Sequence, residues 1–140
     1  MPDSADIAKV FMEAIPYNRA LGMRLISLEE NAVIVEMPYD EKLIGDPETG
    51  VIHGGAVSAL MDATAGTAVV THPSRPVGTA TIDLRIDYMR PATPGQSIVA
   101  RAECYHMTRT VAFIRAVAMD DDRARPVATA TGAFTVERAS

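Results

Sequence analysis

Residues 54–71, GGAVSALMDATAGTAVVT, consist almost entirely of small and apolar side chains, and this segment constrains the fold more than any other. We interpret it as a helix. A helix that is apolar on all sides is normally surrounded by protein rather than lying on a surface. Its small side chains also allow a curved sheet to come close. We therefore expect one long central helix in contact with a sheet.

Strand-like patterns flank this helix on both sides. Residues 22–38 hold two apolar runs joined through Glu30 and Asn31, which predict a hairpin. In the first run after the helix, apolar residues alternate with charged ones from Ile82 to Tyr88, so one face is core and the other is solvent or an interface. Four such runs follow one another and predict an antiparallel meander, at residues 79–88, 96–106, 109–120 and 127–136.

The N-terminal part predicts a short amphipathic helix over residues 4–15, with Ser4 or Asp3 as cap and Pro16 closing it. Its apolar positions near helical spacing are Ile7, Val10, Phe11 and Ile15. Residues 41–50 are rich in Gly, Pro and acids, which is typical of an ordered loop. The chain thus predicts an α+β protein with a single domain over residues 1–140.

Charge and composition exclude several classes of protein. With 18 acidic and 13 basic residues the formal net charge is −5, which argues against a nucleic-acid partner. No apolar run approaches the roughly 20 residues of a membrane span, and the first residues do not resemble a signal peptide. We expect a cytoplasmic protein. Cys104 is expected to be a small core residue, the three histidines lack metal-ligand spacing, and residues 120–122 predict a solvated acidic turn.

Asp62 is the one charged residue in the central helix. An ionised carboxylate without partners in an apolar setting costs several kcal/mol, on the order of the effective burial penalty of an ion. One interpretation is a partly exposed acid, or one satisfied by Ser58, by Thr64 or by a neighbouring chain. The other is a catalytic carboxylate that acts as nucleophile or general base.

The start of the helix offers a second chemical feature. Gly54 and Gly55 follow His53, and the free N–H groups and positive dipole end suit an oxygen with developing negative charge. His53 and Asp62 are separated by about 13 Å along the helix axis and lie on opposite faces. A site that uses both must combine two subunits, with each Asp62 near the Gly54 of the partner subunit across a two-fold axis.

The sequence His53-Gly54-Gly55, followed by Asp62, resembles the hotdog-fold acyl-CoA thioesterases of the phenylacetate-pathway (PaaI-like) type, in the 4-hydroxybenzoyl-CoA thioesterase superfamily. The segments LGMRL, GDPETGVIHGG and TIDLRIDYMRPATPG are similar as well, so the resemblance covers nearly the whole chain. It implies an antiparallel sheet wrapped around a long central helix, with an N-terminal helix. It also implies hydrolysis of an aryl-CoA or a short- to medium-chain acyl-CoA to free acid and CoA.

The resemblance implies a role for each matching residue. Asp62 is the nucleophile or the general base, and the Gly54 N–H polarises the thioester carbonyl across a dimer interface. His53 orients this loop or touches the ligand, and Thr81 positions the attacking water or the carboxylate. Gly55 is expected to contact the substrate.

At one point the chain departs from the family. Many members carry Asn or Gln six or seven residues before the histidine, where this chain has Asp46 and Pro47. Asp46 is expected to contact the substrate through a hydrogen bond when protonated, or through water. The positive groups Arg90, Arg109 and Arg75 are expected to meet the phosphates of CoA, two or three of them converging in the assembled oligomer.

The implied reaction requires neither a metal nor a cofactor, since CoA is part of the substrate. The expected partners are acyl-CoA and further copies of the chain, in a homodimer or homotetramer, and not nucleic acid or a membrane. Two other functions stay open. One is hydration or dehydration of an acyl thioester with proton transfer by His53, and the other is binding of a CoA thioester without cleavage.

Overall fold

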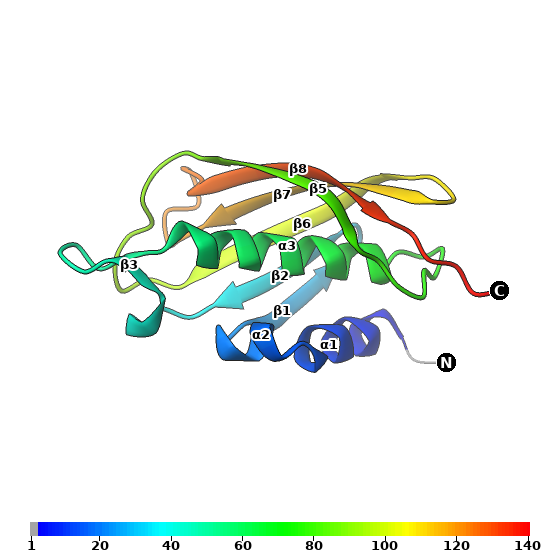
Figure 1. Cartoon of the computed structure of the whole chain (residues 1–140), viewed down its shortest axis with the longest axis horizontal. Coiled ribbons are helices and arrows are strands. Elements are labelled where there is room, and N and C mark those ends of the chain that lie inside the picture. Colours follow the sequence, from blue (N-terminus) through cyan, green and yellow to red (C-terminus); the bar gives the residue numbers. More distant parts are fainter. Residues whose placement is uncertain (1–2) are drawn as a thin grey trace.

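The computed structural model describes residues 3–140, in which a six-stranded antiparallel sheet curves around the central helix α3, Gly54–Val70 (Figure 1). The strand order is β1-β2-β6-β7-β8-β5. The strands span β1 Arg24–Glu29, β2 Ala32–Met37, β5 Thr81–Tyr88, β6 Ile98–Met107, β7 Val111–Met119 and β8 Ala128–Thr135. The predicted architecture, a sheet around one long helix, is therefore confirmed.

Helix α3 is buried along most of its length, as its composition predicts. Leu60, Met61 and Val69 have no exposed surface. Two polar residues are buried with them, and their hydroxyls donate to the carbonyls one turn back, Thr64 to Leu60 at 2.6 Å and Thr67 to Ala63 at 2.8 Å. Since each buried hydroxyl has a partner, the helix carries no uncompensated polar group on this face.

The last four strands do not form a simple meander, so this prediction is wrong for β5. Strand β5 pairs with β8, whereas β6 pairs with β2 and β7. Residues 89–97 carry the chain from one edge of the sheet to its interior. As an edge strand, β5 leaves Ile82 and Tyr88 more than half exposed, at 56% and 53%, although their alternation predicts a core face.

Two helices precede the sheet where one was predicted. Helix α1, Ser4–Ala14, is capped by Asp3, whose carboxylate accepts the Asp6 N–H at 2.8 Å. Pro16 does not end the helical region but opens helix α2, Pro16–Ala20, because proline is well suited to the first position of a helix. The inner face of α1 carries the buried residues Ala8 and Met12, while Val10, one of the apolar positions of the predicted amphipathic helix, is 67% exposed.

The predicted loop at residues 41–50 is more regular than expected. A single 3₁₀ turn, η1 Glu41–Leu43, leads into β3 Ile44–Asp46, which pairs with β4 Val51–Ile52 in a two-stranded sheet. The His53 N–H then donates to the Leu43 carbonyl at 2.8 Å. This hairpin therefore ties the start of α3 to the loop before it.

A buried ion pair lies directly after the C-terminal end of β5. Arg90 donates to both carboxylate oxygens of Asp120 at 2.7 Å, and Thr93 donates to the same carboxylate through its N–H and its hydroxyl, both at 2.9 Å. The Asp120 side chain is fully buried, so the prediction of a solvated turn is wrong for this residue. The pair joins the crossover after β5 to the turn between β7 and β8.

Replacing Asp120 with Asn should destabilise the fold by about 3 kcal/mol, since the Arg90 guanidinium loses its buried counter-charge. The pair holds the pKa of Asp120 well below its usual range, so its contribution is present above the ordinary carboxyl pKa and is lost as the pH falls below it. Urea unfolding at pH 7 should show the full difference from wild type, and the difference should shrink below about pH 4. Asp121→Asn, at an exposed neighbour, is the matched control. Equal stability of the Asp120 and Asp121 variants would contradict this role.

Candidate active site

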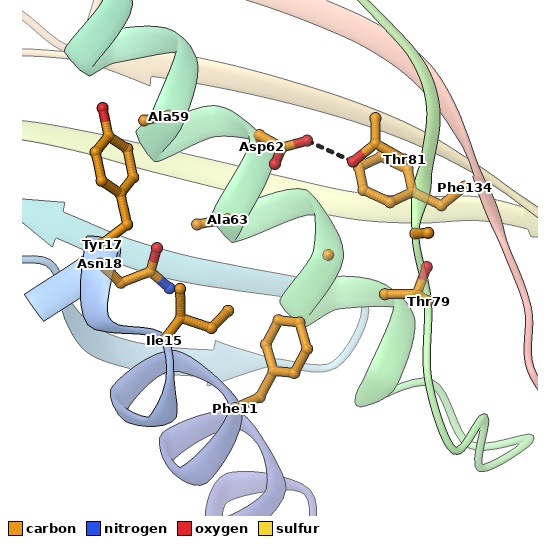
Figure 2. A pocket seen from close by; sticks show the side chains of 12 residues that line it. Phe11, Ile15, Tyr17, Asn18, Ala59, Asp62, Ala63, Thr79, Thr81 and Phe134 are labelled. Atoms are coloured by element: carbon orange, nitrogen blue, oxygen red, sulfur yellow. Dashed lines mark hydrogen bonds between the residues drawn. The ribbon is translucent and has the colours of Figure 1, made fainter.

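Asp62 lies on α3 with a hydrogen-bond partner from the edge strand. The Thr81 hydroxyl, at the start of β5, donates to Asp62 Oδ1 at 2.7 Å (Figure 2). The two partners considered from sequence are engaged elsewhere, since Thr64 donates to the Leu60 carbonyl and Ser58 to the Gly54 carbonyl. The carboxylate is thus half-buried and compensated by a residue from another element, while no bond within residues 3–140 engages its Oδ2.

A cavity of about 320 Å³ lies beside Asp62. Helices α1, α2 and α3, the start of β5 and the end of β8 form its walls (Figure 2). Its apolar lining residues include Phe11, Ile15, Ala59, Ala63 and Phe134, and its polar ones include Asn18, Thr79 and Thr81. The contribution of α1 and α2 could not be predicted from the sequence, because an apolar residue that lines a cavity has the same helical spacing as one in the core.

At the N-terminus of α3, His53 caps the helix. Its Nδ1 accepts the Gly55 N–H at 2.7 Å, and its carbonyl accepts the Ala56 N–H at 3.0 Å. Within residues 3–140, no group accepts a hydrogen bond from the Gly54 N–H. Of the first three N–H groups of the helix, the one at Gly54 is therefore available to a ligand.

Tyr88, which the sequence analysis did not single out as a site residue, also contacts this end of the helix. Its hydroxyl donates to the Gly54 carbonyl at 2.9 Å and bonds the Ser58 hydroxyl. A second cavity, of about 460 Å³, lies here and is lined by residues that include Gly54, Val57 and Met89. The position of Tyr88 at the end of a strand was visible in the sequence, but its contact with α3 depends on where β5 lies.

Gly54 and Asp62 lie in different parts of one protomer. Eight residues separate them, which corresponds to about 12 Å along the helix axis. The cavity at Asp62 and the cavity at Gly54 have no lining residue in common. A single chain therefore holds two separate groups, a carboxylate with Thr81 and a free N–H with Tyr88.

The remaining predicted substrate residues are dispersed. Asp46 accepts from the Thr49 hydroxyl at 2.8 Å and the Glu48 N–H at 3.1 Å, so its carboxylate closes the β3–β4 turn. Arg90 is engaged by Asp120, which differs from the expectation that it meets phosphate groups. Arg109 lies in the β6–β7 turn, at the opposite end of β8 from Arg90, so one protomer does not bring these two together.

The part of the chain that the structure covers holds no cluster of three His, Cys, Asp or Glu side chains that could bind a metal ion. None of its helices is both long and apolar enough to cross a membrane. Cys104 is half-buried in β6, and burial raises the pKa of its thiol, which makes it a poor nucleophile at neutral pH.

Residues 49–127 match the sequence profile of the Thioesterase superfamily. The chain belongs to this superfamily. A crystal structure of a Pseudomonas aeruginosa protein aligns with a TM-score of 0.85 and 39% identity, covering 94% of this chain and 98% of that one. The Escherichia coli PaaI protein of the phenylacetic acid degradation operon aligns with a TM-score of 0.86 over 98% of this chain and 95% of its own, and at 20% identity it shows the shared fold.

A relative in sequence comes from Escherichia coli strain K12. It is named medium/long-chain acyl-CoA thioesterase YigI and is 27% identical, over 93% of this chain and 91% of its own length. Together these similarities confirm the predicted membership of the hotdog-fold thioesterases. The matched segment contains His53, Gly54, Asp62 and Thr81.

The approach to His53 depends on a glycine in β3. A Cβ atom at Gly45 would lie 2.7 Å from the His53 Cα, closer than real Cβ contacts, so backbone must move. Gly45→Ala should destabilise the protein by about 1–3 kcal/mol, the usual cost of overpacking. Gly66→Ala is the control, because its Cβ would meet Phe11 at an ordinary 3.6 Å and alanine favours a helix. Urea unfolding measures both, and a Gly45 variant as stable as the control would contradict the close approach.

Proposed function

We propose that this protein hydrolyses acyl-CoA thioesters, of aryl or short- to medium-chain acyl groups, at a site shared by two subunits. The observation that carries the proposal is Asp62, held by Thr81 in the wall of an apolar cavity. Membership of the Thioesterase superfamily and similarity to a protein named acyl-CoA thioesterase support the reaction. The cavity supplies room for an acyl group next to the carboxylate.

The edge strand supports a two-fold arrangement. Within residues 3–140, β5 is hydrogen-bonded on one side alone, to β8, and it leaves Ile82 exposed. An unpaired edge with exposed apolar side chains favours pairing with another strand. Two β5 edges that pair antiparallel about a point between Leu84 and Arg85 place Thr81 opposite Tyr88 of the partner subunit.

The two-fold axis between the paired β5 strands also relates the α3 helices of the two subunits. Thr81 bonds Asp62 and Tyr88 bonds Gly54 within each chain, so pairing of the strands in this register carries Asp62 toward Gly54 of the partner subunit. On the helix, the axis lies near Ser58, midway between Gly54 and Asp62. Each pair of subunits then holds two equivalent sites, each with one carboxylate and one free N–H.

The chemistry follows from these groups. The thioester carbonyl accepts the Gly54 N–H of the partner subunit, which stabilises the oxyanion of the tetrahedral intermediate. Asp62, steadied at Oδ1 by Thr81, acts at Oδ2 as general base or as nucleophile. In the nucleophilic route Oδ2 bonds to the carbonyl carbon as the C–S bond breaks, and water then cleaves the resulting anhydride, which frees the acid and the Asp62 carboxylate and supplies the proton of the CoA thiol. In the general-base route the water oxygen bonds to carbon, the C–S bond breaks, and the proton on Asp62 passes to the departing CoA thiolate. The free acid and CoA are released.

His53 has a structural task in this scheme. Its Nδ1 accepts the Gly55 N–H, so proton transfer at that nitrogen would require loss of the cap. A hydration reaction with His53 as acid or base would therefore have to use Nε2, whereas the proposed hydrolysis needs no proton transfer by His53. The cap instead keeps the first turn of α3 in the conformation that leaves the Gly54 N–H free.

Removing the carboxylate tests the reaction. Asp62→Asn should lower kcat by about 10²–10⁴-fold, the usual contribution of a general base, while Thr81→Val should cost about tenfold through the lost hydrogen bond. Release of free thiol from a panel of acyl-CoAs measures both. Full turnover by Asp62→Asn would refute the mechanism, and a thermal shift by CoA without hydrolysis of any member by wild type would indicate a binding protein.

Mixing two inactive variants tests whether the site is shared. Gly54→Pro removes the N–H at the first helical position, where proline is tolerated, and the extended backbone of His53 suits a following proline. After refolding of an equal mixture of Gly54→Pro and Asp62→Asn chains, each mixed dimer has one complete shared site, so about a quarter of the wild-type activity should return.

The control is each variant refolded alone, which should stay inactive. A site contained within one chain would give no recovery, because every chain in the mixture lacks either the N–H or the carboxylate. Mixtures that stay inactive, although mixed dimers form, would therefore contradict the shared site.

A further inference from the structure

The end of the Asp62 cavity is formed by an aromatic ring from the N-terminal helix. Gly66 lies one helical turn beyond Asp62 on α3, about 6 Å along the axis, and it lines the same cavity. A Cβ atom at Gly66 would lie 3.6 Å from Cε1 and Cζ of Phe11 and 3.8 Å from Cε2 of Phe134. Figure 2 shows the Phe11 ring directed at this turn of α3. The cavity is therefore bounded on this side by Phe11.

We infer that Phe11, together with the absent side chain at Gly66, sets the length of the acyl group that the site accepts. This inference rests on the proposed function and adds the substrate range. With the thioester carbonyl at Asp62, an acyl group that runs along α3 meets the Phe11 ring after about one helical turn. A short or medium chain, or a compact aromatic group, fills this space, whereas a longer chain collides with the ring.

The size and lining of the cavity agree with this limit. Its volume of about 320 Å³ is near the lower end of the range for small-molecule pockets, about 300–1,000 Å³. Ile15 and Ala63 supply apolar walls between Asp62 and Phe11, and Ala59 lines the cavity on the other side of Asp62. Burial of each methylene of the substrate against them is favourable, so the chain that just reaches Phe11 gains the most.

Phe11 can be altered without detaching α1 from the protein. The buried residues of this helix are Ala8 and Met12, with at most 1% exposure, while Phe11 is half-buried and faces the cavity. Asn18 of α2 donates through Nδ2 to the Met12 carbonyl at 3.2 Å, which ties the two helices together. The position of α1 thus depends on contacts other than the Phe11 ring.

The test compares kcat/KM for saturated acyl-CoAs from butanoyl to hexadecanoyl in four proteins: wild type, Phe11→Ala, Gly66→Ala and Val10→Ala. Phe11→Ala should move the optimum to longer chains and raise the long-to-short ratio of kcat/KM by about tenfold or more, since one methylene in an apolar pocket is worth at least that factor. Gly66→Ala should move it to shorter chains. Val10→Ala, on the exposed face of the same helix, should keep the wild-type profile.

The outcomes separate this inference from the proposed function. If wild type releases no thiol from any acyl-CoA, the proposed function fails and the inference with it. If wild type is active and both Phe11→Ala and Gly66→Ala keep its chain-length profile, the inference is overturned while the proposed function stands. Should Phe11→Ala fail to fold, Gly66→Ala decides alone, because its methyl group fits at an ordinary contact distance.

Discussion

The close approach of α3 to the sheet is the constraint on which the rest of the structure depends. The small side chains of the helix meet buried alanines on the two central strands, Ala100 and Ala102 on β6 and Ala116 and Ala118 on β7. Two surfaces without bulky side chains can pack at short range, and they leave no room for an unpaired polar group between them. A charged residue on α3 must therefore face away from β6 and β7, and Asp62 does so, toward the cavity and Thr81 of the edge strand β5.

Strand β5 connects the two chemical groups of the site. Its first residue bonds Asp62 and its last bonds the carbonyl of Gly54, so a displacement of the strand along α3 would change both contacts together. The buried pair of Arg90 and Asp120 holds the chain directly after β5. Although it touches neither chemical group, this ion pair helps to determine where both of them lie.

The sequence was informative wherever a feature is local. The central helix, the first hairpin and the spacing from His53 to Asp62 depend on neighbouring residues, and all could be predicted. The partner of β5 could not, because alternation from Ile82 to Tyr88 is the same for an inner strand and an edge strand. Contacts between residues far apart in the chain, such as Thr81 with Asp62, likewise depend on the sheet topology. The sequence pattern alone does not specify this topology.

The segment that matches the superfamily does not contain the whole cavity. Residues 49–127 contain the carboxylate, its hydroxyl partner and the free N–H, whereas Phe11 and Ile15 lie outside this segment. Asp62, Thr81 and Gly54 thus come from one stretch of the chain, and one wall of the cavity comes from another. Exchange of residues 3–20 between related proteins would therefore reshape one wall of the cavity and leave Asp62, Thr81 and Gly54 in place.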